Sequence, residues 1–212
     1  SPAVAALRDM GIPIAVGHSA GNLGQAALVI RTAAVKDDNP EIVAAMAAGV
    51  PVLARAQAWG FVMADYRSAV CIAGTHGKTS TTSMASMVAL AAGLDPAIMV
   101  GGDLAAIGGP LRIGGGQLFI AEADESDGSF LCLLPIMNVV TNVDLDHADH
   151  YPSLESIVEA LLTFMNNVLS YGVNVVCGDD PGVRRVSHRV KGPLLSSGFG
   201  SRQDSTAEVL RP

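Results

Sequence analysis

The sequence predicts an α/β protein with a mainly parallel sheet. Short apolar runs alternate with helical patterns along the 212 residues, and one of these runs leads through a glycine-rich turn directly into a helix. Half of the residues are hydrophobic, which is ample for a buried core. Repeated alternation of strands and helices produces a parallel sheet with helices packed on its faces.

The first part of the chain contains three strand candidates and one helix with clear start and stop signals. The strand candidates are residues 12–16, 27–30 and 52–54. Asn39 supplies an N-cap for a helix over residues 40–48, with Pro40 at its first position and Glu41 in its first turn. Gly49 marks the end of this helix.

A second series of strands follows a helical pattern over residues 55–65. Its strand candidates are residues 69–73, 118–121, 137–141, 173–177 and 194–197. We therefore expect two domains, residues 1–67 and 68–212. The glycine-rich segment 101–116 is expected to be a functional loop between sheet elements. Because the chain starts within a helical pattern and stops in a polar tail, we expect both ends to be cut.

Composition limits the class of protein. Mean hydropathy is +0.39, yet no apolar run approaches the roughly 18 residues that cross a bilayer. The start of the chain has neither an initiator Met nor the features of a secretory signal, so we expect that the natural start is missing or that the chain was processed. The three cysteines form no CxxC pair and two of them lie in apolar strand-like runs, which favours a reducing cytoplasm. A net charge of −7 without a basic cluster argues against a nucleic-acid surface. The sequence does not set the oligomeric state.

Residues 74–82, GTHGKTSTT, form a variant phosphate-binding loop (P-loop) between a strand and a helix. Gly74 and Gly77 allow a tight turn whose backbone N–H groups face phosphate oxygens, and the helix N-terminus adds a favourable dipole. Lys78 then reaches the terminal phosphates, and Thr79 offers its hydroxyl to Mg²⁺. The alternative is a glycine-rich structural turn. The histidine at position 76 either contacts phosphate or packs as an uncharged loop residue.

Acidic residues follow a second strand in the segment IAEADESDGSF, residues 120–130. Ligands bind at the carboxyl edge of open α/β sheets, so Glu122 is the best-placed Mg²⁺ ligand. Asp124, Glu125 and Asp127 are either further ligands or members of a solvated acidic turn that caps a helix.

A third cluster, TNVDLDHADHY at residues 141–151, lies just beyond another strand. His147 could bind metal through one ring nitrogen while a carboxylate fixes the other. A zinc site is the competing interpretation, although zinc ligand sets are usually richer in Cys and His. His150 could simply be exposed.

These three motifs, in this order, resemble those of the Mur ligases, most closely the members that add L-alanine to UDP-N-acetylmuramate. The resemblance extends to the front of the chain through Gly17-His18, Asn22 and residues 38–41, DNPE. It implies a partial Rossmann-like domain for the UDP-sugar followed by a partial P-loop ATPase-type central domain. The chain departs from the family at Arg31-Thr32, where a pair of serines is usual.

The resemblance also implies the chemistry: the lactyl carboxylate attacks the γ-phosphate of ATP, and L-alanine then displaces phosphate from the acyl phosphate. Cofactors would be ATP and Mg²⁺, in peptidoglycan precursor synthesis. Without a third domain and the later adenine-contacting residues, we expect this segment alone to be inactive. The implied catalytic residues are Lys78, Glu122 and His147; the nucleotide-binding residues are Gly74, Thr75, His76, Gly77, Lys78, Thr79, Ser80 and Asn142; and the metal ligands are Thr79, Glu122 and His147.

Three rival functions stay open. A murein tripeptide recycling ligase of the same superfamily has a similar P-loop, but usually a tyrosine where this chain has Ser126. A P-loop switch or kinase would turn over nucleotide without L-alanine. A nucleotide-binding remnant would bind nucleotide without ligase activity.

Overall fold

The computed structural model describes residues 2–146, 150–200 and 203–207. By compactness the chain divides into two units, Ser1–Ala58 and Trp59–Pro212, and helix α3 (Arg55–Ala64) contains the division. No helix among the described residues is long and apolar enough to span a bilayer.

The first unit is small. Its β1 (Val29–Arg31) and β2 (Val52–Ala54) pair in parallel, with Val29 opposite Val52. Its remaining elements are α1 (Pro2–Asp9), the 3₁₀ helix η1 (Ala20–Leu23) and α2 (Pro40–Ala47). The cap of α2 is confirmed, because the Asn39 side chain accepts a hydrogen bond from the Glu41 N–H at 2.9 Å. Residue Gly49, just after the helix, has a positive φ of 69°.

One strand prediction in this unit is wrong. Residues 12–16 have no regular structure, and Val16 is 90% exposed. A short apolar run becomes a strand only where a neighbour can accept its backbone hydrogen bonds and cover its side chains, and this run pairs with no described strand. The prediction for residues 27–30 is shifted to Val29–Arg31.

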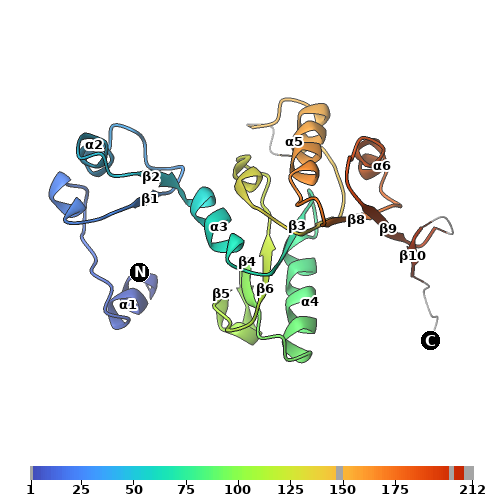
Figure 1. Ribbon diagram of the computed structural model, residues 1–212, viewed down its shortest axis with the longest axis horizontal. Helices are drawn as coiled ribbons and strands as arrows, with labels where there is room; N and C mark the ends of the chain where they lie inside the picture. Colours follow the sequence, from blue (N-terminus) through green and yellow to red (C-terminus); the bar gives the residue numbers. More distant parts are fainter. Residues whose placement is uncertain (1, 147–149, 201–202, 208–212) are drawn as a thin grey trace. The chain divides into compact units, whose positions relative to one another are not determined.

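The second unit is built on an eight-stranded sheet in the order β10-β9-β8-β7-β3-β6-β4-β5 (Figure 1). Among the described strands only β5 runs antiparallel to its neighbour, so the sheet is mainly parallel, as predicted. Its strands are β3 (Ser68–Ala73), β4 (Ala97–Leu104), β5 (Gly109–Arg112), β6 (Leu118–Glu122), β7 (Met137–Val140), β8 (Val173–Cys177), β9 (Leu194–Gly198) and β10 (Ser205–Thr206). Its helices, beyond the end of α3, are α4 (Lys78–Ala91), α5 (Leu154–Asn166), α6 (Pro181–Ser187) and the 3₁₀ helices η2 (Ala105–Ile107) and η3 (Ser129–Cys132).

Helices cover both faces of this sheet, with α4 on one side and α5 and α6 on the other in Figure 1. Alternate residues of β3 follow the two faces. Ile72 packs with Ala89 of α4, whereas Cys71 and Ala73 belong to the larger core that contains Leu161 and Phe164 of α5. A strand buried on both faces explains the continuous apolar run SAVCIA. Burial also raises the pKa of the Cys71 thiol.

Half of the glycine-rich segment 101–116 is strand, which corrects the prediction of a loop. Strand β4 continues to Leu104, and η2 then connects it to β5. Glycines weaken a strand pattern in sequence, but they also mark places where another group approaches the backbone closely. At Gly101 that group is the Glu122 carboxylate.

Two buried asparagines hold β7 and β8 against the end of α5. Asn138 donates to the Phe164 carbonyl at 3.1 Å and to Asn174 Oδ1 at 3.2 Å, and Asn174 donates to the Met165 carbonyl at 3.1 Å. These bonds add donors to two carbonyls in the last turn of α5, where helix carbonyls run short of intrahelical partners; the Phe164 carbonyl also accepts from the Asn167 N–H at 3.1 Å. They also fix the two strands whose carboxyl ends carry Asn142 and Asp180.

Candidate active site around the P-loop

The carboxyl ends of β3, β6 and β7 meet at one edge of the sheet. Strand β3 lies between the other two, with Ile72 opposite Glu122 and Ala73 opposite Val140. The P-loop follows β3 directly, so the segments after β6 and β7 flank it on opposite sides. The structure therefore brings the described residues of the three motifs to one edge of the sheet.

Two glycines shape the P-loop. Gly74 has φ 125° and Gly77 has φ 81°, which is the left-handed region that side chains rarely adopt. A Cβ atom at position 74 would also collide with the Thr141 hydroxyl and the Asn142 backbone. Gly77 precedes α4 without a side-chain cap, and Thr79 and Ser80 in the first turn of the helix are exposed. Uncapped N–H groups at a helix start are suited to an anion.

Lys78 is held between the loop and a buried acid. Its Nζ atom donates to the Gly74 carbonyl at 2.9 Å, to the Thr75 carbonyl at 3.4 Å and to Glu125 Oε1 at 2.9 Å. The Lys78 side chain is 11% exposed and that of Glu125 is 1% exposed.

Thr79 and Glu122 lie side by side. The Thr79 hydroxyl donates to Glu122 Oε1 at 3.0 Å, and the Gly101 N–H donates to Glu122 Oε2 at 2.7 Å. A hydroxyl and a carboxylate at this spacing are the hard oxygen donors that Mg²⁺ prefers. No group of three or more His, Cys, Asp or Glu side chains suited to a metal occurs in the part of the chain that the structure describes. The oxygen donors of Thr79 and Glu122 fit Mg²⁺, which keeps waters and phosphate oxygens as ligands, better than they fit zinc.

The third predicted metal ligand, His147, lies outside the described residues, and so does Asp149. Its role as a ligand stays a prediction. His150 is exposed, as the simpler interpretation expected, and packs edge-on against Tyr151.

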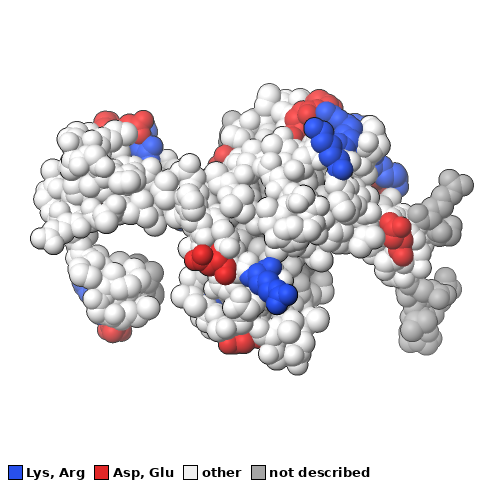
Figure 2. All heavy atoms as spheres, in the orientation of Figure 1, with Lys and Arg blue, Asp and Glu red and all other residues white. Residues whose placement is uncertain are grey.

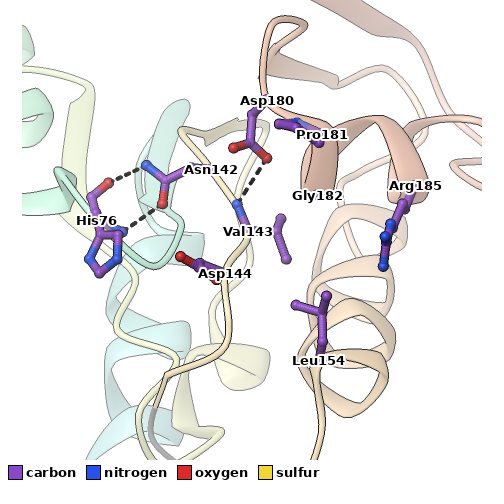
Figure 3. A pocket seen from close by; sticks show the side chains of 9 residues that line it. All are labelled: His76, Asn142, Val143, Asp144, Leu154, Asp180, Pro181, Gly182 and Arg185. Atoms are coloured by element: carbon purple, nitrogen blue, oxygen red, sulfur yellow. Dashed lines mark hydrogen bonds between the residues drawn. The ribbon is translucent and has the colours of Figure 1, made fainter.

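The β7 side of the loop is held by neutral side chains. Asn142 accepts from the His76 N–H at 2.7 Å and donates to the His76 carbonyl at 2.8 Å (Figure 3). Thr141 donates to the same carbonyl at 2.8 Å. The Thr75 hydroxyl donates to the Asp144 carbonyl and accepts from the Asp144 N–H, at 3.1 and 2.9 Å. Asn142 thus contacts the P-loop backbone directly.

A cavity of about 330 Å³ opens on this side, bounded by the P-loop, the segment after β7 and the start of α6 (Figure 3). Asp180 forms part of its wall, where it caps α6 by accepting from the Val183 N–H at 2.7 Å and ties the β7 segment by accepting from the Val143 N–H at 3.2 Å. The His76 ring borders this cavity in Figure 3 instead of packing into the core. Arg185 of α6 supplies a basic group to its lining.

The acids after Glu122 have different roles. Asp124 accepts from the Ser126 N–H at 3.1 Å, and Asp127 accepts from the Ser129 N–H at 2.9 Å at the start of η3, so both close turns as the alternative interpretation expected. Burial opposes ionisation of Asp127, but the hydrogen bonds from Ser129 outweigh it and lower the pKa of Asp127. Glu125 differs from both, because it is buried against Lys78. Nothing in the local sequence distinguishes it from its neighbours.

In the first unit, four of the residues on which the resemblance rests lie close together: Gly17, His18, Asn22 and Glu41. Glu41 Oε1 accepts from Asn22 Nδ2 at 2.8 Å and lies 3.3 Å from His18 Nδ1, and Asn22 also donates to the Gly17 carbonyl. The Asn22 hydrogen bond is the largest of the contacts that lower the pKa of Glu41. Nearby in sequence, Arg31 pairs with Asp37 at 2.6 Å.

Acidic and basic side chains are intermixed over the region of α5 and α6 on the face that Figure 2 shows. There Arg189 pairs with Glu159 at 2.7 Å and with Glu155 at 3.5 Å.

Comparison with known proteins agrees with the resemblance to the Mur ligases. Residues 72–210 match the Mur ligase middle domain, and residues 1–67 match the Mur ligase family, catalytic domain. The chain is 51% identical over 209 residues to a UDP-N-acetylmuramate–L-alanine ligase of Nitratidesulfovibrio vulgaris, covering 99% of the chain and 46% of the relative. It is 54% identical over 204 residues to the enzyme of that name from Lawsonia intracellularis, covering 96% of the chain and 45% of the relative.

Solved structures of Mur ligases share the fold of this chain. The UDP-N-acetylmuramate–alanine ligase of Thermotoga maritima superposes with a TM-score of 0.76 at 32% identity, covering 97% of this chain and 46% of that one. A murein peptide ligase of Psychrobacter arcticus, at 22% identity, shares the fold with a TM-score of 0.82 and covers 98% of this chain and 48% of that one. The chain spans about half the length of the curated relatives it matches. From its motifs, its fold and these matches, the chain belongs to the Mur ligase family.

Proposed function

We propose that this chain forms the UDP-sugar-binding and ATP-binding parts of a ligase that joins L-alanine to UDP-N-acetylmuramate. The observation that carries the ATP site is the convergence of Lys78, Thr79 and Glu122 at the carboxyl edge of the sheet. The choice of substrates is supported by relatives of that name that are about half identical over nearly the whole chain. We place the boundary between the two parts near residue 67.

The reaction has two steps. An oxygen of the lactyl carboxylate forms a bond to the γ-phosphorus of ATP while the bond to the bridging oxygen breaks, which gives acyl phosphate and ADP. The amine of L-alanine then attacks the acyl carbon, phosphate leaves, and the amine loses a proton to form the amide. The activation is needed because oxide is a poor leaving group, whereas phosphate is a good one.

The residues of this chain bind and orient the nucleotide. The P-loop N–H groups and the start of α4 hold phosphate oxygens, with Gly74, Thr75, His76, Gly77, Ser80 and Asn142 shaping or lining that cradle. Lys78 stabilises charge that develops on the transferred phosphoryl group. Thr79 and Glu122 would hold Mg²⁺, with His147 as a further ligand, and the ion would neutralise charge on the phosphates.

We propose a cytoplasmic location for this reaction. It is supported by the three cysteines, which are free thiols as a reducing compartment favours.

The test uses a full-length protein that carries this segment, with phosphate release from ATP as the readout. Release should require both UDP-N-acetylmuramate and L-alanine. Turnover that depends on the tripeptide L-alanyl-γ-D-glutamyl-meso-diaminopimelate in place of L-alanine would identify a recycling ligase. Turnover that needs no amino acid would identify a nucleotide switch, and nucleotide binding without turnover would identify a remnant. Each of these three results contradicts the proposal.

A further inference from the structure

The Lys78 ammonium has its full set of hydrogen-bond partners within the protein. An ammonium group has three donors, and three oxygens receive them: the Gly74 and Thr75 carbonyls and Glu125 Oε1. Any phosphate oxygen that binds Lys78 must displace one of them. The bond to Thr75, at 3.4 Å, is the longest and the first to yield, while the two bonds of 2.9 Å can remain.

Glu125 is an unusual partner for this lysine. A carboxylate that is 1% exposed requires a large desolvation free energy, and buried ion pairs seldom add stability over an apolar pair of the same size. Stability alone therefore gives a weak reason for the pair. A functional reason for the pair is stronger, because the Glu125 carboxylate contacts Lys78, the lysine of the P-loop.

The backbone around Glu125 is fixed from both sides. Its carbonyl accepts from the buried Tyr151 hydroxyl at 2.8 Å and from the Gly128 N–H at 3.0 Å. The turns closed by Asp124 and Asp127 flank it. This support holds the carboxylate in one place, as precise alignment of Lys78 requires.

We propose that Glu125 is a positioning residue for Lys78: it keeps the ammonium at the mouth of the P-loop before nucleotide binds and retains it there while Lys78 exchanges the Thr75 carbonyl for a phosphate oxygen. This inference rests on the proposed ATP site. It adds a residue that acts on phosphate only through the lysine.

The proposal predicts a split between rate and affinity. Without its counter-ion, Lys78 is free to bind phosphate in several positions, so ground-state affinity for nucleotide is unchanged or tighter. Its alignment in the transition state is poorer, and kcat falls roughly 10- to 100-fold, the range that misplacement of a catalytic group by about 1 Å produces. A residue with a purely structural role would weaken binding and folding together.

The test compares Glu125→Gln with wild type and with Glu155→Gln, the same substitution at a side chain of α5 that is 70% exposed and pairs with Arg189. In the full-length ligase, Glu125→Gln should lower kcat roughly 10- to 100-fold without raising KM for ATP, and Glu155→Gln should leave kcat unchanged. In a Lys78→Ala background, Glu125→Gln should have no further effect on kcat. An unchanged kcat in Glu125→Gln, a raised KM for ATP, or the same loss in both backgrounds would overturn the proposal.

A second measurement keeps this test separate from the proposed function. Binding of Mg²⁺ with a non-hydrolysable ATP analogue is measured by calorimetry on the same variants. If the wild type binds nucleotide but makes no amide, the ligase assignment fails. The positioning role still stands if Glu125→Gln binds the nucleotide analogue at least as tightly as wild type and any gain in affinity is absent in the Lys78→Ala background. It falls if Glu125→Gln binds the analogue more weakly than wild type.

Discussion

The two sides of the P-loop are built from different kinds of contact. On the β6 side, charged side chains meet other side chains: Lys78 meets Glu125, and Thr79 meets Glu122. On the β7 side, neutral groups of Asn142 and Thr141 bond the backbone of the loop. The side-chain contacts place a cation and oxygen donors where a metal–nucleotide complex can bind, whereas the bonds to the backbone fix the shape of the loop. The β6 side is therefore suited to chemistry and the β7 side to support.

The largest effect is expected on the β6 side, for Lys78→Met. Loss of a preorganised donor to developing negative charge should lower kcat about 10²- to 10³-fold, or about 3 kcal/mol. The variant should also be less stable, because it leaves Glu125 buried without its cation. Adding Glu125→Gln should restore stability but not turnover. Phosphate release and thermal unfolding of the single and double variants check this, and recovery of turnover in the double variant would contradict it.

On the β7 side, Gly74→Ala should distort the loop. Position 74 combines φ 125° with a collision against Thr141 and Asn142. We expect about 1–3 kcal/mol of destabilisation from strain, with further loss from the collision and weakened nucleotide binding. Gly108→Ala is the matched control, since Gly108 has φ 74° but open space around it. Equal losses of stability in denaturant unfolding would show that the contact with the β7 segment does not matter.

Asn142→Ala should have a smaller effect. It removes both bonds to the His76 backbone, so we expect about 1–3 kcal/mol of lost stability. Nucleotide affinity should fall while kcat at saturating ATP changes little, because the loop is misshapen but Lys78 and Thr79 remain. Asn142→Asp, which keeps only the acceptor, should lie between the two. A kcat loss as large as that of Lys78→Met would contradict the distinction between the two sides.

The smallest effect concerns Tyr151, which supports Glu125. Burial, with the nearby Glu125, Asp127 and Asp124 charges, raises the pKa of Tyr151 to about 12 from its ordinary 10.0. The folded state thus holds this proton more tightly, so its contribution to stability is complete below pH 10 and is lost as the pH rises from about 10 to about 12. Tyr151→Phe should flatten the stability profile over that window. Parallel profiles for wild type and variant would contradict the pKa shift.

The sequence predicts the site at the carboxyl edge of the sheet better than it predicts the individual strands. The apolar runs of β3, β6 and β7 and the polar residues after them are enough to bring Lys78, Thr79 and Glu122 together, because parallel strands end at one edge. The strand β4 is harder to predict, since glycines at 101 and 102 weaken its pattern, and the close approach of the Glu122 carboxylate to Gly101 comes from a distant part of the sequence. The apolar run at residues 12–16 is misleading for the opposite reason, because it has the composition of a strand but pairs with no strand that the structure describes.

Burial separates Glu125 from the acids beside it, and burial depends on tertiary packing. In the run ADESD, three carboxylates occur within four residues, yet two close local turns and one lies under the P-loop lysine. Neither hydrophobic periodicity nor composition reveals which of the three carboxylates is buried.

The central claim is that Thr79 and Glu122 act together on one metal–nucleotide complex beside Lys78. It is tested most directly by a double-mutant cycle of Thr79→Val and Glu122→Gln, with nucleotide affinity measured in the presence and absence of Mg²⁺. The account predicts a coupling of about 1 kcal/mol or more with Mg²⁺ and near zero without it. Additive losses with Mg²⁺, or the same coupling without the ion, would contradict it.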